Sequence, residues 1–158
     1  MTGTTPVEAE LAAHPALADL PGAVHVMVAR CGEHVVVPAG RVLMREGGVA
    51  STFYLILRGR VAVELPRPAG GPLVIATVDD GGMVGWSWLF APHRWHFDAR
   101  TLTEVEAVAV GAAALRAACD ADPATGYHLV GRIAELAIGH LHAARTQLLD
   151  LTSDPRRR

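Results

Sequence analysis

The central part of this chain, residues 33–110, alternates short apolar runs with glycine, proline and aspartate. The apolar runs are residues 34–37, 41–45, 53–57, 61–65, 73–78, 95–103 and 105–110. Short β-rich runs at regular spacing, separated by tight corners, are typical of an antiparallel sandwich or jelly roll. We therefore predict that residues 33–110 form a β-roll, a jelly-roll barrel of the double-stranded β-helix type.

Helical patterns flank this segment on both sides. The predicted helices are residues 7–13, 21–31, 112–121 and about 123–151. Prolines separate the two N-terminal helices within residues 1–32, because proline lacks the amide donor that a helix needs. Asp122 and Pro123 supply a capping side chain and a proline at the first helical position of the long C-terminal helix. The predicted fold class is mainly β with N-terminal helices and a long C-terminal helix, in one domain with a tail at 152–158.

The long predicted helix carries a seam of apolar residues spaced alternately by four and three positions. The seam consists of Val130, Ala134, Ala137, Leu141, Ala144, Leu148 and Leu151. Heptad spacing with small alanines lets two helices approach closely. We expect a homodimer through this helix. The alternative is one broad apolar surface that faces the core of a monomer.

Charge and cysteine content exclude several classes of function. The net charge is −2, and all 14 basic side chains are arginines, so no basic face of the kind that binds nucleic acid is expected. No apolar run reaches the roughly 18 residues of a membrane span. Cys31 and Cys119 lack the spacing of a metal or redox motif. We expect a cytoplasmic protein that binds neither DNA nor membrane. His14 and His25 have no predicted partner.

Residues 84–100 hold all three tryptophans of the chain, Trp86, Trp88 and Trp95, together with two histidines and two arginines. Indole rings are large and rigid, and they stack on flat rings and on guanidinium groups. The stretch therefore forms either a stacking pocket for a ligand or an unusually heavy local core. Both interpretations remain open from the residues alone.

Three motifs resemble the cyclic-nucleotide-binding domain family, the sensor module of the cAMP receptor protein and FNR-type regulators. The motifs are Pro-Ala-Gly-Arg-Val-Leu-Met-Arg-Glu-Gly at 38–47, Phe-Tyr-Leu-Ile-Leu-Arg-Gly-Arg-Val at 53–61 and Gly-Gly-Met-Val-Gly at 81–85. The resemblance extends over nearly the whole chain and implies a β-roll with a ligand-sensing role. A fold alone does not identify its ligand.

In that family a phosphate-binding cassette holds the ligand through a glutamate and an arginine. The resemblance places Trp86 at the glutamate position and His93 at the arginine position, with Arg94 next to it. An imidazole lacks the permanent charge and the two-pronged donor of a guanidinium. We therefore expect a nucleotide-like or other anionic aromatic ligand, not cAMP bound with high affinity; a nucleotide is the candidate cofactor. The predicted ligand-binding residues are Gly85, Trp86, Ser87, Trp88, His93, Arg94 and Trp95.

Catalysis and metal binding are not expected. Ser87 with His93 or His96 lacks the oriented third group of a nucleophile and base pair, and the two histidines lack further convergent metal ligands.

Two other functions are alternatives to the sensor. The residues at 85–90 and 94–100 are also similar to a standalone branch of the family that includes small accessory subunits of soluble NAD-reducing hydrogenases. That similarity implies a ligand-free interaction subunit of a redox enzyme, or binding of a nicotinamide-type nucleotide. A transcription regulator is disfavoured, because only seven residues follow Leu151, too few for a helix-turn-helix.

Overall fold

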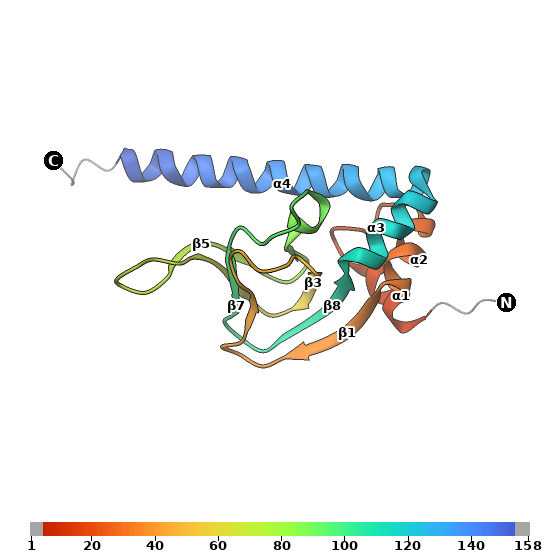
Figure 1. Ribbon diagram of the computed structural model, residues 1–158, viewed down its shortest axis with the longest axis horizontal. Helices are drawn as coiled ribbons and strands as arrows, with labels where there is room; N and C mark the ends of the chain where they lie inside the picture. Colours follow the sequence, from red (N-terminus) through yellow and green to blue (C-terminus); the bar gives the residue numbers. More distant parts are fainter. Residues whose placement is uncertain (1–4, 154–158) are drawn as a thin grey trace.

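Two antiparallel sheets form a β-roll in the computed structural model, which describes residues 5–153 (Figure 1). The strands are β1 (Gly32–Val37), β2 (Val42–Met44), β3 (Thr52–Arg58), β4 (Val61–Leu65), β5 (Leu73–Val78), β6 (Met83–Val84), β7 (Asp98–Thr101) and β8 (Val105–Gly111). One sheet has the order β1-β8-β3-β6, and the other has the order β2-β7-β4-β5. The predicted mainly-β fold with flanking helices is confirmed.

The first sheet is centred on β3 and β8, whose apolar residues lie opposite each other. Phe53 pairs with Val110 and Leu55 with Val108, and all four side chains are buried. β-Branched and aromatic residues suit such cross-strand pairs because they pack well on a pleated surface. This pairing gives the roll a firm apolar layer against which later elements pack.

The strand predicted at residues 95–103 is shorter than expected, since β7 covers Asp98–Thr101. Trp95 lies in the loop before β7. The Gly47 amide donates to the Trp95 carbonyl at 2.8 Å, and the Trp95 amide donates to the Gly48 carbonyl at 2.9 Å. The backbone of Trp95 is thus bonded to the turn at Gly47 and Gly48 and not to a partner strand. Strand β7 therefore begins only at Asp98.

Four α-helices flank the roll: α1 (Pro6–Ala13), α2 (Gly22–Arg30), α3 (Ala112–Ala121) and α4 (Pro123–Thr152). As predicted, Asp122 caps α4, and its carboxylate accepts from the Thr125 amide at 3.2 Å. Figure 1 shows α4 running along the length of the roll, as far as the hairpin that contains β5. The first half of α4 buries Leu129 and Ile133, whereas every residue from 141 to 153 is exposed. Only the first half is therefore held firmly by the rest of the chain.

Arg132 joins α4 to the segment between α1 and α2. Its guanidinium donates to the Ala16 carbonyl at 2.9 Å and to both carboxylate oxygens of Asp19 at 2.8 and 2.7 Å. A two-pronged guanidinium–carboxylate pair fixes orientation as well as distance. The position of the long helix is thereby coupled to the N-terminal segment.

His14, which has no predicted partner in the sequence, bridges the same N-terminal segment to the roll. The ring is buried, with Nε2 3.0 Å from the Ile56 carbonyl and Nδ1 accepting from the Ala16 amide at 3.1 Å. These two bonds require a neutral ring that is protonated on Nε2. Burial lowers the pKa of His14 below its ordinary value, despite the bond to Ile56.

We expect acid to destabilise the fold through His14. The pKa in the folded protein lies below the ordinary value of 6.5, so the contribution of the neutral ring is complete above that pH. It is lost as the pH falls through the folded pKa, because the unfolded chain then binds more protons. Between about pH 7.5 and about pH 5.5, the denaturant concentration at the midpoint of unfolding should fall more for the wild type than for His14→Gln. Equal falls would contradict this role.

Candidate ligand-binding site

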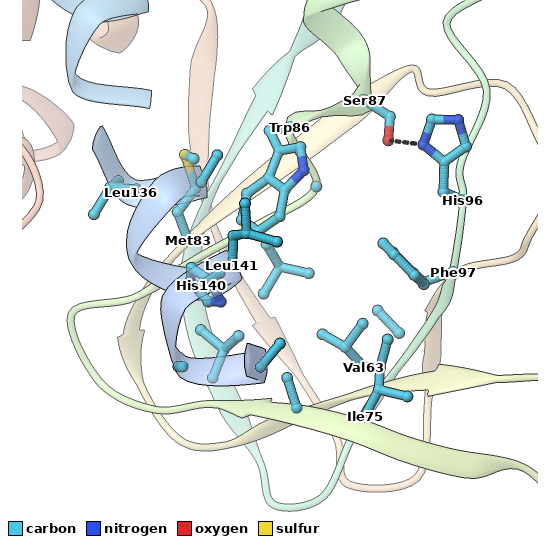
Figure 2. Close-up of a pocket in the computed structure, with 18 of the residues that line it drawn as sticks. Val63, Ile75, Met83, Trp86, Ser87, His96, Phe97, Leu136, His140 and Leu141 are labelled. Carbon is cyan, nitrogen blue, oxygen red and sulfur yellow. Dashed lines mark hydrogen bonds between the residues drawn. The ribbon is translucent and has the colours of Figure 1, made fainter. Parts of the chain in front are cut away.

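A cavity of about 910 Å³ lies between the β-roll and α4 (Figure 2). Strands β4 and β5 form one side, β6 and the short 3-10 helix η1 (Trp86–Leu89) form a second, and the loop leading into β7 forms a third. Residues 135–147 of α4 contribute the last side. Most lining side chains are apolar, including Val63, Ile75 and Met83. This size and character are those of a small-molecule site.

Gly85 turns the chain from β6 into η1. Its φ of +95° lies in the left-handed region that favours glycine. A Cβ atom here would lie 2.9 and 3.0 Å from two ring atoms of Trp95 and would also collide with Met44. The Trp95 ring therefore packs directly on the Gly85 backbone, and both residues line the cavity.

Trp86 brings η1 into contact with α4. Its indole meets the imidazole of His140 edge-on, with ring centroids 5.0 Å apart and an interplanar angle of 63°. Figure 2 shows the two rings side by side at the cavity. Burial lowers the pKa of His140 below its ordinary value, so the ring is neutral near neutral pH. This contact joins α4 to η1 at the cavity.

Ser87 and His96 form a polar edge of the cavity. The Ser87 hydroxyl lies 3.5 Å from Nδ1 of His96, which is long for a hydrogen bond of this kind. Asp98 also lines the cavity, but its carboxylate accepts from the Glu46 amide at 2.8 Å. The His96 ring also lies edge-on to Phe97, with ring centroids 6.4 Å apart. The pair offers a ligand one hydroxyl and one imidazole.

Of the seven predicted ligand-binding residues, Gly85, Trp86, Ser87 and Trp95 line the cavity, and Trp88 does not. Trp88 is completely buried and stacks on Phe53, with ring centroids 5.1 Å apart and planes 10° from parallel. The placement of Trp88 at the ligand is therefore corrected. It is a core residue, because in η1 its side chain points to the β3 side and away from α4.

His93 and Arg94 also lie outside the cavity, which corrects their predicted placement. The His93 carbonyl accepts from the Ala50 amide at 2.8 Å. Arg94 is exposed and donates to the Gly47 carbonyl at 3.3 Å. These bonds to the loop between β2 and β3 hold residues 93–94 away from α4. The guanidinium proposed as an anion partner is therefore engaged elsewhere.

The structure adds site residues that the sequence analysis did not assign to the ligand. They are His96 and Phe97 before β7, Ile75 in β5, and His140 in α4. For α4, the sequence did contain one indication of a site. His140 lies four residues after Leu136, so an imidazole stands within an apolar stripe on one helix face. No pattern in the sequence indicated which elements would face that stripe.

The cavity contains little charge. Among the described residues that line it, none is an arginine, and the chain has no lysine. Its two carboxylates belong to Asp98 and to Glu135, which pairs with Arg132 at 3.0 Å. The remaining polar lining residues are Thr77, Ser87, His96, His140 and Gln147. The site is therefore apolar, with hydrogen-bonding side chains at its edges.

Residues 5–153 contain neither a cluster of metal-ligating side chains nor a helix that could span a membrane. No group of three or more His, Cys, Asp or Glu side chains converges there in the way a metal site requires. Of the pair His93 and His96, only the second lines the cavity. None of the helices in this range combines the length and the apolar character needed to cross a bilayer.

The family model for the cyclic nucleotide-binding domain matches residues 34–122, more than half of the chain. The chain belongs to this family. The matched segment begins in β1, ends just after α3 and includes the Gly85 turn with η1. The predicted family resemblance is confirmed, and with it the regulatory type of fold found in Crp/Fnr-like sensors. No curated protein is significantly similar to the chain.

Several solved structures share the fold. A cyclic nucleotide-binding protein from Geobacter metallireducens GS-15 is 24% identical, with a TM-score of 0.77 and coverage of 87% of this chain and 100% of that one. A cyclic nucleotide-binding domain from Methylobacillus flagellatus KT is 18% identical, with a TM-score of 0.80 and coverage of 93% and 85%. The sensor domain of the transcriptional regulator DNR from Pseudomonas aeruginosa is 13% identical, with a TM-score of 0.65 and coverage of 81% and 86%. At these identities the likeness shows the fold alone.

We expect Gly85→Ala to destabilise the domain by about 1–3 kcal/mol, because the new methyl group meets the Trp95 ring and the backbone must keep a positive φ. Gly131→Ala is the matched control, since a Cβ at that helical position has open space around it. The control should be neutral or stabilising by up to about 1 kcal/mol. Denaturant unfolding of both variants measures the difference. Similar stabilities would show that Trp95 does not pack tightly on Gly85.

Proposed function

We propose that the chain is a non-catalytic regulatory module that binds a small organic ligand in the cavity and thereby sets how α4 lies on the roll. The proposal is based on one observation: both the β-roll and α4 line the cavity. Residues 135–147 of α4 line it together with Gly85 and η1. A ligand in this space contacts the roll and the helix at once, so its binding free energy depends on the helix position.

The ligand-binding role is supported by the apolar lining and by Trp86. A half-buried indole at the edge of a cavity can stack on a flat ring, and such stacking contributes about 1–3 kcal/mol. The cavity volume of about 910 Å³ lies within the usual range for ligand pockets. The sequence-based expectation of an aromatic, nucleotide-like ligand is consistent with this lining.

We do not propose that the cavity binds cAMP with high affinity. The residue at the family's glutamate position is Trp86, and the residue at the arginine position, His93, lies outside the cavity. Arg94 does not replace it, because its guanidinium contacts Gly47. A cyclic phosphate would thus lose the guanidinium that normally pairs with it.

Ligand binding should protect the second half of α4. We expect a bound ligand to slow amide hydrogen exchange in residues 141–152 and to raise the melting temperature, because the ligand fills the space beneath the helix. Nucleotides, nucleosides and planar aromatic compounds form the test panel. Ile75→Trp, which fills the cavity, should abolish both effects, whereas Thr146→Ala, outside the cavity lining, should not. Protection that persists in Ile75→Trp would place the ligand elsewhere.

A second copy of the chain is the partner that we propose for α4. Several apolar side chains on this helix are exposed in the described structure: Val130, Ile138, Leu141, Leu148, Leu149 and Leu151. The predicted seam of Val130, Ala134, Ala137, Leu141, Ala144 and Leu148 is heptad-spaced, as a two-helix interface requires. Its members Ala137, Leu141 and Ala144 also line the cavity, so a partner helix on this seam would lie at the edge of the ligand site. An accessory role in a larger complex, such as a redox enzyme of the hydrogenase type, is the alternative use of the same seam. A cytoplasmic location fits the two free cysteines, Cys31 and Cys119.

Leu148→Glu should shift the chain from dimer to monomer. The side chain is exposed and does not line the cavity, so the substitution adds a charge to the seam and leaves the fold intact. Thr146→Glu is the control, because residue 146 lies off the seam. Light scattering after gel filtration gives the mass of each variant. A monomeric wild type would contradict the homodimer, and the seam would then be an interface for a different protein.

A further inference from the structure

The charge of the cavity restricts the class of ligand that it can hold. Its ionisable side chains are two carboxylates and two imidazoles, and none of the described lining residues is an arginine. Both carboxylates already have partners. Asp98 accepts a hydrogen bond from the Glu46 amide, and Glu135 forms an ion pair with Arg132. An anion that moves from water into this space leaves its solvent shell and gains no guanidinium or ammonium partner among the described lining residues. Unpaired charge in such surroundings costs several kcal/mol.

The nearby arginines cannot supply the missing charge from their present positions. Arg100 follows Ala99 in β7 but does not itself line the cavity. Its guanidinium lies 3.5 Å from the buried carboxylate of Glu64. Arg132 is held by Asp19 and by the Ala16 carbonyl. Arg132 also pairs with Glu135 at the edge of the cavity, so each of these guanidinium groups already has a carboxylate partner.

Aromatic groups occupy two separate sides of the cavity. Figure 2 shows Trp86 beside α4 and Phe97 across the open space from it, with Val63 and Ile75 below. Two rings that face a shared space accept a flat molecule, because stacking on each face buries apolar area without requiring charge.

Hydrogen-bonding side chains lie at opposite edges of the same space. The Ser87 hydroxyl and the His96 imidazole are at one edge, and the His140 imidazole is at the α4 edge. A hydroxyl group can donate or accept, and so can a neutral imidazole through its two nitrogens. Such groups orient an uncharged ligand that carries polar atoms on its rim.

We infer that the ligand is an uncharged, planar aromatic compound with hydrogen-bonding groups on its edge, and not a phosphate-bearing nucleotide. This inference rests on the proposed function, because it names the chemical class that the same cavity takes. It departs from the sequence-based expectation of an anionic ligand. The observation behind the departure is the position of Arg94 outside a cavity that the sequence had placed around it.

Two matched pairs of probes test the charge preference on the full chain. 1-Naphthol and 1-naphthyl phosphate share one ring system, and adenosine and cAMP share a base and sugar; the members of each pair differ in the phosphate. Isothermal titration calorimetry measures binding. We expect 1-naphthol to bind at least about ten-fold more tightly than 1-naphthyl phosphate, and adenosine to bind more tightly than cAMP.

Engineered charge provides the decisive control. Gln147→Arg places a guanidinium on an exposed α4 residue that lines the cavity, and it should improve 1-naphthyl phosphate binding by about ten-fold while leaving 1-naphthol binding nearly unchanged. Thr146→Arg adds the same charge to a residue outside the lining and should change neither. Equal effects of the two variants would mean that the phosphate is bound outside the cavity.

The outcomes separate this inference from the proposed function. If the phosphate member of each pair binds as tightly as the neutral member or more tightly, the inference is overturned and the cavity remains a ligand site. If no probe binds and none alters α4 exchange, both the inference and the proposed function fail. Tighter binding of the neutral members, lost in Ile75→Trp, supports both.

Discussion

The cavity depends on the close approach of the Trp95 ring to the backbone of Gly85. A side chain at position 85 would occupy the space that the indole fills, and the positive φ of Gly85 aims the chain from β6 into η1. The two residues after this turn contribute directly to the site, Trp86 toward α4 and Ser87 toward His96. This contact joins the loop before β7 to the turn after β6, in addition to the backbone hydrogen bonds that tie the loop to Gly47, Gly48 and Ala50.

The same turn gives the first two tryptophans different environments. Trp86 remains half-buried beside His140, whereas Trp88 is fully enclosed against Phe53. Arg116 of α3 donates to the Trp88 carbonyl at 2.8 Å and holds η1 against the helix that precedes α4. One short helix therefore connects the interior of the first sheet to the cavity surface. The stretch is both a heavy local core and part of a pocket, which the sequence had presented as alternatives.

The parts of the structure that the sequence predicted are those with local causes. Turn residues at regular spacing define the β-roll, and the Asp122–Pro123 pair defines the start of α4. The positions of His93 and Arg94 could not be predicted, because their loop is set by hydrogen bonds from Gly47 and Ala50, more than forty residues earlier. Likewise, nothing local indicates that His140 meets Trp86 across 54 positions of sequence.

The uneven support along α4 has a consequence for how a ligand enters. Residues 141–153 are exposed throughout, and a helical segment of this length is only marginally stable in water without packing. Its local opening free energy is accordingly lower than that of the first half, where Leu129 and Ile133 are buried. We expect fraying of the second half to uncover the cavity from the side of Ala143 and Gln147, which both line it. A ligand would then enter by local unwinding of one helix end, without any break in the pairing of the two sheets.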